Sequence, residues 1–178
     1  MSELRVLLVG LPGVGKSEVG RALSARTGWP YLDNQQLLAL VTDRGYDEEV
    51  AEGGLEAQTR IDSEALTEAV TAEPPVIAEV PAGVVEATYD RARLEQGGYV
   101  VWVSAPPRVA AAHLGDDGSD PAWAGDDPVA TLSELEEERN DLYALVADLT
   151  IDVSVLSPEE AAERVLAALE DEQLYSTG

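Results

Sequence analysis

The sequence predicts an α/β fold in which a parallel β-sheet is covered by helices on both faces. The first observation is that apolar, strand-like runs alternate with helical patterns along the chain. The second is a glycine-rich turn between the first strand and the first helix. The third is that no internal repeat or low-complexity linker divides the 178 residues, so we expect a single domain over 1–178.

Five apolar runs predict the strands of the sheet. They occupy residues 4–9, 31–33, 76–80, 99–103 and 149–153. The first helix is expected over 17–26, with its apolar side chains facing the sheet. The last helix is expected to follow Ser157, because a serine cap, Pro158 in the first turn and Glu160 three residues on are typical of a helix start.

Two segments outside these elements have compositions typical of irregular structure. Residues 114–128 are acidic and rich in Gly, Asp and Pro, so we expect a surface loop that covers a site as a lid. Residues 173–178 are expected to form a frayed tail.

The composition limits the partners of the chain. Its 35 acidic and 11 basic residues give a net charge of −24, which disfavours nucleic acid and anionic membranes as partners. The same bias is typical of a solvated acidic face, a high-salt cytoplasm or a GC-rich genome. No apolar run approaches the roughly 18 residues of a membrane-spanning helix, and the absence of cysteine excludes disulfides and thiolate metal sites. The N-terminus runs directly into the first strand and leaves no room for a signal peptide, so we expect a cytoplasmic protein, monomeric or with a protein partner.

The segment from Gly10 to Ser17 fits the phosphate-binding pattern G-x-x-x-x-G-K-[ST] in every defined position. Its glycines let backbone amides converge on a polyphosphate, the ammonium of Lys16 reaches the outer phosphates, and the hydroxyl of Ser17 can hold magnesium. ATP and Mg²⁺ are therefore the expected cofactors. The expected nucleotide-binding residues are Gly10, Pro12, Gly13, Val14, Gly15, Lys16, Ser17 and Glu18. The alternative is a strand-to-helix turn that binds nothing.

Two acidic residues join Ser17 as candidate metal ligands. Asp33 follows the second strand, at the edge of such a sheet where ligands bind, and Glu79 follows the third apolar run, where many phosphate-loop enzymes place an acid near the metal. Each has a structural alternative. Asp33 could cap a helix that starts at Asn34, and Glu79 could be a strand-end carboxylate that faces water.

Three parts of the chain together resemble the shikimate kinase family: the loop, the segment Trp29-Pro30-Tyr31-Leu32-Asp33, and the stretch from Asp127 through Arg139 to Leu149. The likeness covers nearly the whole chain in order and spacing. It implies a five-stranded parallel sheet, an ATP site at the loop, a mobile lid and a small-substrate pocket. It also implies that Lys16 and Asp33 serve catalysis, with Asp33 holding magnesium through water, and that Arg139 binds a substrate carboxylate.

Two substrate positions of the family pattern are changed. Gln35 stands where the pattern has a second aspartate near the hydroxyl that is phosphorylated, and a glutamine can orient a hydroxyl but cannot accept its proton. The pattern's substrate arginine aligns with Thr59 and its acid with Asp62, although a one-residue shift would give the arginine's role to Arg60. We expect Gln35, Arg60 and Arg139 to bind the acceptor.

Two further departures concern the backbone after the third strand and the lid. The triple glycine of the pattern is Val80-Pro81-Ala82-Gly83 here, so close backbone approach to a substrate is less expected. The catalytic arginine of the lid aligns with Asp120. An arginine aimed at the migrating phosphoryl group is worth about 10³ to 10⁵ in rate in the systems studied, whereas an aspartate opposes the developing negative charge.

Two functions fit these residues. In the first, the protein is an ATP-dependent kinase of a small hydroxylated metabolite, for which shikimate is a doubtful substrate. In the second, it is a catalytically degenerate paralogue that binds nucleotide and regulates or partners another enzyme. The role of Arg139 is open as well, because an exposed ion pair with Glu136 or Glu138 is the alternative to substrate binding. The residues do not distinguish ATP from GTP.

Overall fold

The computed structural model describes residues 3–116 and 121–176 of the chain. Its sheet has five parallel strands in the order β2-β3-β1-β4-β5. The strands are β1 (Arg5–Val9), β2 (Tyr31–Leu32), β3 (Val76–Glu79), β4 (Tyr99–Ser104) and β5 (Leu149–Asp152). The α-helices are α1 (Lys16–Thr27), α2 (Asn34–Val41), α3 (Tyr46–Thr71), α4 (Thr88–Gly97), α5 (Pro107–Ala112), α6 (Pro128–Val146) and α7 (Pro158–Asp171), and the 3₁₀ helices are η1 (Ala82–Glu86) and η2 (Pro121–Ala124).

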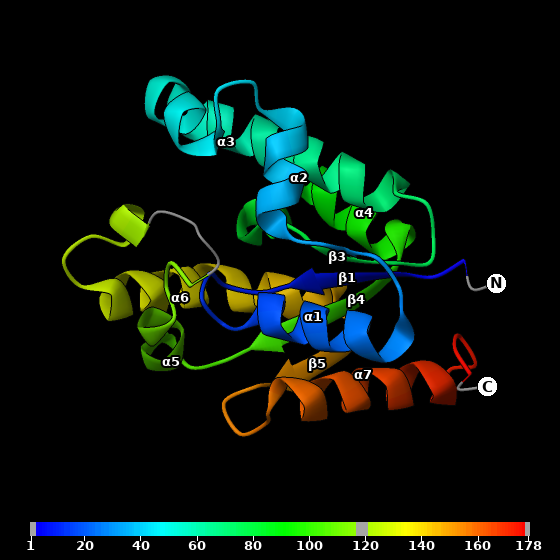
Figure 1. Cartoon of the computed structure of the whole chain (residues 1–178). Coiled ribbons are helices and arrows are strands. Elements are labelled where there is room, and N and C mark those ends of the chain that lie inside the picture. The colour runs from blue at the N-terminus through cyan, green and yellow to red at the C-terminus, as the bar shows by residue number, and fades with distance from the viewer. Residues whose placement is uncertain (1–2, 117–120, 177–178) are drawn as a thin grey trace.

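Helices cover both faces of this sheet (Figure 1). On one face α1 packs against α7 and contacts β1 and β3, whereas α4 and α6 contact β4 on the other face. The central strand β1 is buried from Val6 onward and β3 is buried throughout, because a parallel sheet between two helical layers has no face open to water. The predicted α/β architecture with a five-stranded parallel sheet is confirmed.

The predicted strands and the two predicted helices are present with small changes in their bounds. The strand β2 ends at Leu32, because Asp33 caps the helix α2. At the start of α7, the hydroxyl of Ser157 accepts from the backbone N–H of Glu160 at 3.1 Å, and the carboxylate of Glu160 accepts from the backbone N–H of Ser157 at 2.8 Å. This reciprocal pair is the helix start expected from the sequence.

The strand order places a crevice at one end of the sheet. The chain passes from β1 to the edge strand β2, returns to β3, and then crosses to β4 on the other side of β1. A crevice outside the carboxyl ends of the strands forms at such a switch point, and ligands bind there. Figure 1 shows these ends on the left, beside the loop that precedes α1 and beside α5 and η2.

The segment expected to form a lid contains regular structure where it is described. Residues 121–124 form η2, in which Ala124 is buried, and the carbonyl oxygen of Ala124 accepts from the hydroxyl of Thr131 at 2.7 Å. Asp120, the residue aligned with the lid arginine, lies outside the described residues, so its effect stays a prediction.

The C-terminal segment, expected to fray over 173–178, contacts the rest of the fold as far as Tyr175, and residues 177–178 lie outside the described part of the chain. The backbone N–H groups of Leu174 and Tyr175 both donate to the carbonyl oxygen of Leu169, at 2.8 and 3.3 Å. The ring of Tyr175 packs edge-on against Trp29, with ring centroids 5.3 Å apart. Aromatic burial therefore holds a polar tail that sequence composition alone marks as mobile.

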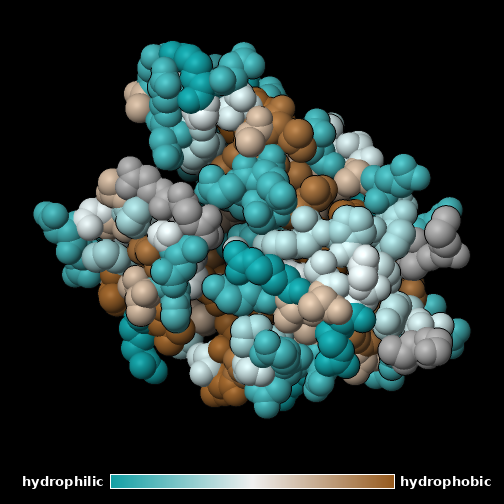
Figure 2. Space-filling view, in the orientation of Figure 1, coloured by the Kyte–Doolittle hydropathy of each residue, from teal (hydrophilic) through white to brown (hydrophobic). Residues whose placement is uncertain are grey.

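The surface agrees with the acidic composition. Figure 2 shows one face of the molecule as mostly hydrophilic, with apolar atoms in scattered patches. No helix in residues 3–116 or 121–176 is both long enough and apolar enough to span a membrane.

Candidate active site

The predicted phosphate loop lies between β1 and α1 and is pressed against two neighbouring elements. Gly10 and Gly13 have positive φ angles of 150° and 78°, which glycine adopts readily. A Cβ atom on Gly10 would lie 2.4 Å from the carbonyl oxygen of Val103, and one on Gly13 would lie 2.3 Å from that of Ala110. The loop fits against β4 and α5 because both residues are glycines. It leads into the N-terminus of α1, where free amides and the helix dipole favour anions.

Lys16 is held inside this loop. It is the first residue of α1 and is only 6% exposed. Its Nζ donates to the carbonyl oxygens of Gly10 at 2.8 Å and Leu11 at 2.9 Å. Because the ammonium is already ordered beside the loop amides, little further side-chain entropy would be lost when a phosphate binds.

Glu79 joins the loop to the second and third strands. It is 4% exposed, and one oxygen of its carboxylate, Oε2, accepts from the hydroxyl of Ser17 at 3.0 Å and from the phenol of Tyr31 at 2.7 Å. The alternative of a carboxylate that faces water is therefore wrong, and Ser17 and Glu79 lie together as a candidate metal pair. Burial, followed by the charge of Glu79 and the hydrogen bond to it, raises the pKa of Tyr31, so the phenol stays a donor.

Tyr31 is a residue that the sequence did not single out. Its ring packs over Gly20 of α1, where an added Cβ atom would lie 2.3 Å from the ring. A tyrosine at the start of a strand carries no local signal for such a role. The partner of its hydroxyl, Glu79, is 48 positions away and meets it only in the folded chain.

Asp33 is the N-cap of α2. Its Oδ1 accepts from the backbone N–H of Gln36 at 2.7 Å, and the side chain of Gln36 accepts from the backbone N–H of Asp33 at 2.9 Å. The capping role is confirmed. The charge of Asp33 also contributes to the raised pKa of Tyr31, so it acts on the region around Glu79. Its role toward magnesium stays a prediction, since one oxygen is engaged in the cap.

The residues near the loop fit a magnesium ion that binds together with a nucleotide. Among residues 3–116 and 121–176, no group of three or more His, Asp or Glu side chains could hold a metal ion by itself. Magnesium is usually bound through one or two carboxylates together with phosphate oxygens and water. A hydroxyl and a buried carboxylate beside a phosphate loop match that requirement.

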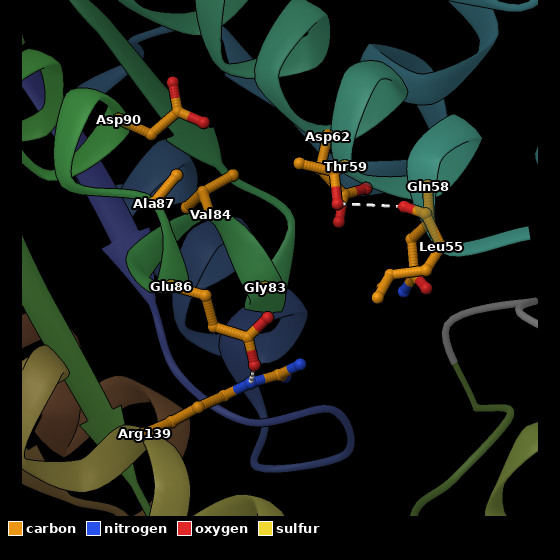
Figure 3. A pocket seen from close by; sticks show the side chains of 10 residues that line it. All are labelled: Leu55, Gln58, Thr59, Asp62, Gly83, Val84, Glu86, Ala87, Asp90 and Arg139. Carbon is orange, nitrogen blue, oxygen red and sulfur yellow. Dashed lines mark hydrogen bonds and ion pairs between the residues drawn. The ribbon is translucent and has the colours of Figure 1, made fainter.

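A cavity with a volume of about 220 Å³ lies between α3, η1, the start of α4 and α6. Figure 3 shows side chains from α3 on one side of it, with η1, the start of α4 and a residue of α6 on the other. The lining residues are Leu55, Gln58, Thr59, Asp62, Gly83, Val84, Glu86, Ala87, Asp90 and Arg139. Pockets for drug-sized ligands have volumes of about 300–1,000 Å³, so this smaller cavity suits a small metabolite.

Arg139 projects from α6 into the cavity, and its side chain is 10% exposed. Its Nε donates to Oε1 of Glu86 at 2.9 Å. The exposed ion pair with Glu136 or Glu138 is therefore not what the structure shows. Burial disfavours the charge of Arg139, but the neighbouring Tyr143 and Glu86 outweigh it and raise the pKa of the guanidinium.

Asp62 faces Arg139 across Gly83. A Cβ atom on Gly83 would lie 3.3 Å from Oδ2 of Asp62 and 3.5 Å from Nη2 of Arg139. The absence of a side chain there leaves room for the two charged groups, so one glycine of the altered segment does serve the cavity. Asp62 is 7% exposed, and burial raises its pKa to about 7, although Arg139 and a hydrogen bond with Tyr46 act in the opposite direction.

The structure separates the two candidates for the arginine position. Thr59 lines the cavity, and its hydroxyl donates to the carbonyl oxygen of Leu55 at 2.9 Å. Arg60 does not line this cavity, since one residue along a helix turns a side chain by about 100°; it lines an adjoining hollow that shares Thr59 and Asp90 with the cavity. Its half-exposed guanidinium pairs with Glu64 at 3.2 Å and Glu49 at 3.6 Å. Gln35, in the first turn of α2, is not among the lining residues either.

Known proteins are similar to this chain over most of its length. A family model described as shikimate kinase matches residues 12–170. The chain is 34% identical to a shikimate kinase of Thermobifida fusca over 163 residues, which cover 92% of this chain and 93% of that protein. It is 38% identical to a shikimate kinase of Nitratidesulfovibrio vulgaris over 149 residues, which cover 80% and 83%.

Solved structures show the same fold. A shikimate kinase from Acinetobacter baumannii in complex with shikimate superposes with a TM-score of 0.85 at 24% sequence identity, covering 97% of this chain and 96% of that one. A gluconokinase from Sinorhizobium meliloti superposes with a TM-score of 0.67 at 20% identity, covering 97% and 96%. With the family match over residues 12–170, these findings show that the chain belongs to the shikimate kinase family.

Proposed function

We propose that the chain is an ATP-dependent kinase that phosphorylates a hydroxyl group of a small molecule, and that shikimate is not its preferred acceptor. The contact between Ser17 and the buried Glu79, next to the loop that holds Lys16, carries the first part. A phosphate cradle, a hydroxyl and a carboxylate are assembled there as one unit. The second part rests on the cavity, in which Thr59 replaces a cation and Arg139 is already paired.

In the proposed transfer, the acceptor oxygen attacks the γ-phosphorus, the bond to the β–γ bridging oxygen breaks, and ADP leaves with that electron pair. Lys16 and the loop amides stabilise the charge that develops on the phosphate oxygens. Ser17, Asp33 and Glu79 would hold magnesium, which supplies further neutralisation of that charge when bound. The hydroxyl proton leaves to water, since Gln35 has no basic group to accept it.

The cavity supports a small acceptor other than shikimate. In the family pattern a substrate-binding arginine stands at the position of Thr59, and here that position offers a neutral hydroxyl. Arg139 would have to leave Glu86, or share its charge with it, in order to bind a carboxylate. A small hydroxylated compound without a carboxylate meets neither difficulty.

A steady-state assay of ADP formation with MgATP tests this proposal. With shikimate we expect turnover far below the median enzyme value of about 10 per second. Among hydroxy acids, sugars and amino-alcohols, we expect at least one compound to stimulate ADP formation. A normal turnover number with shikimate would overturn the assignment of the cavity.

The second candidate function is a nucleotide-binding protein that regulates or partners another enzyme. Gln35 and Thr59 favour it, because both remove groups that the family pattern uses on the substrate. MgATP binding without stimulation by any acceptor would support this candidate, whereas one clear acceptor would exclude it.

A further inference from the structure

The charges that line the cavity are predominantly negative. Asp62, Glu86 and Asp90 face one lining cation, Arg139. Asp90 is balanced, since it accepts from the guanidinium of Arg93 at 2.9 Å and from the hydroxyl of Ser63 at 2.9 Å. Glu86 pairs with Arg139, and Asp62 is close to the charge of Arg139 and hydrogen-bonds with the neutral Tyr46, so the described lining holds more negative than positive charge.

The guanidinium of Arg139 already lies close to acidic side chains of the cavity. Its Nε lies 2.9 Å from Glu86, and its Nη2 reaches the space over Gly83 that Oδ2 of Asp62 also borders. A carboxylate that entered the cavity would compete with Glu86 for Arg139 and would be repelled by Asp62. An anionic acceptor is thus disfavoured by groups that are already in place.

Asp62 carries the excess charge where water is scarce. Its side chain lies on the inner face of α3, and burial raises the pKa of its carboxyl to about 7. The raised pKa reports that the ionised form is poorly solvated. A ligand cation would replace the missing solvation and favour the ionised form.

The uncharged residue Thr59 adds a further hydrogen-bond acceptor to the lining. Thr59 donates its hydroxyl hydrogen to the carbonyl oxygen of Leu55, so its oxygen lone pairs remain as acceptors on the cavity side of α3. Together with the carboxylates of Asp62 and Glu86, it presents acceptors to a ligand. An ammonium group, which has three donors and no acceptor, is complementary to such a lining.

We propose that the acceptor is a cationic amino-alcohol, whose ammonium group binds to Asp62 and Glu86 while its hydroxyl group faces the phosphate loop. This inference rests on the proposed kinase function and names its substrate class. Asp62 is the residue that sets the charge preference, and Thr59 is the change that permits it by removing a cation from the lining.

The test uses cyclic triols that carry an ammonium, a hydroxyl or a carboxylate on the same ring carbon. For each compound, kcat/KM is measured with saturating MgATP, and binding is measured by calorimetry with a non-hydrolysable ATP analogue. We expect the ammonium compound to exceed the neutral one at least tenfold, and the carboxylate compound to be the poorest. Equal or better binding of the carboxylate compound would overturn the inference.

The pH dependence of the preference for the ammonium compound tests the charge of Asp62, because a merely structural role of Asp62 would not make that preference depend on pH. With a pKa of about 7, Asp62 is roughly one-tenth ionised at pH 6 and nine-tenths at pH 8. The ratio of kcat/KM for the ammonium compound to that for the neutral compound should therefore rise several-fold, up to about ninefold, between these values. Effects on ATP binding cancel in this ratio. A ratio that is flat with pH contradicts the role of Asp62.

Variants and the set of compounds distinguish a failure of the kinase proposal from a failure of the cation inference. Asp62→Asn should abolish the preference for the ammonium compound and leave the KM for ATP unchanged, whereas Glu64→Gln, on the exposed side of the same helix, should keep it. Thr59→Arg should shift the preference toward the carboxylate compound, which tests the same idea if Asp62→Asn does not fold. If no compound of any charge stimulates ADP formation, the kinase proposal fails; if the neutral or anionic compound wins, only the cation inference fails.

Discussion

Replacing Glu79 by glutamine tests how the metal is held, and its effect can be worked from the structure. The carboxylate of Glu79 lies 3.0 Å from the hydroxyl of Ser17. A magnesium ion bound by that hydroxyl at about 2.1 Å would lie within about 5 Å of the carboxylate. Two unit charges 5 Å apart at an effective dielectric constant near 20 interact by about 3 kcal/mol, and a divalent ion doubles this to about 7 kcal/mol.

We expect Glu79→Gln to weaken the affinity for MgATP by at least two orders of magnitude, because the loss of about 3 kcal/mol for a single unit of metal charge already has that effect. Binding of ATP without magnesium should be unchanged or tighter, because a buried negative charge near the phosphates is removed. The fold should survive, since the amide oxygen of glutamine still accepts from Ser17 and Tyr31. Calorimetric titration of ATP with and without magnesium separates the two effects.

The matched control is Glu95→Gln, an exposed acid on α4. It should leave both titrations as in the parent protein. If Glu79→Gln leaves the magnesium dependence unchanged while Asp33→Asn reduces it, Asp33 alone serves the metal and the Ser17–Glu79 pair is structural.

Three further predictions concern the loop, the cap and pH. MgATP at 100 times its dissociation constant should stabilise the parent protein by about 2.7 kcal/mol, or about 5–10 °C in Tm. Lys16→Ala should lose most of this shift, and the control variant Arg26→Ala should keep it. Equal shifts for the two variants in scanning calorimetry would refute the role of the loop. Asp33→Ala should lower stability by about 1 kcal/mol through the lost cap, measured by denaturant titration, whereas Asp33→Asn keeps the cap. If both variants lose MgATP affinity and only Asp33→Ala loses stability, capping and metal binding are separate roles of Asp33. Burial raises the folded-state pKa of Asp62 to about 7, so the folded protein binds more protons than the unfolded chain between about pH 4 and 7. The contribution of Asp62 to stability is therefore present below pH 4 and is lost as pH rises toward 7. Asp62→Asn should flatten this part of the plot of stability against pH.

The phosphate site and the acceptor cavity differ in how far they keep the family pattern. The loop, Lys16 and Ser17 match it in full, whereas the acceptor side has Thr59 at an arginine position and Gln35 at an aspartate position. A common scaffold with a changed pocket is the usual way in which one fold serves different substrates. We therefore propose a change of acceptor in preference to a loss of nucleotide chemistry.

The position of Arg60 shows the limit of alignment by sequence. A one-residue shift would have placed it on the substrate, and the pattern alone did not decide between Arg60 and Thr59. Neighbouring residues of a helix point about 100° apart, so only the rotation of α3 against the rest of the fold determines which of them lines the cavity.

The sequence by itself determined the strands, the capped start of the last helix, the phosphate loop and the family. These follow from local patterns: apolar runs, a serine followed by proline and glutamate, and glycines at fixed spacing before Lys16. Only the tertiary structure decided that Tyr31 and Ser17 share the carboxylate of Glu79, that Arg139 pairs with Glu86, and that Tyr175 is anchored on Trp29. The physical reason is that each of these contacts joins segments far apart in the chain. How far a buried charged group is stabilised depends on partners from those distant segments, which no local pattern contains.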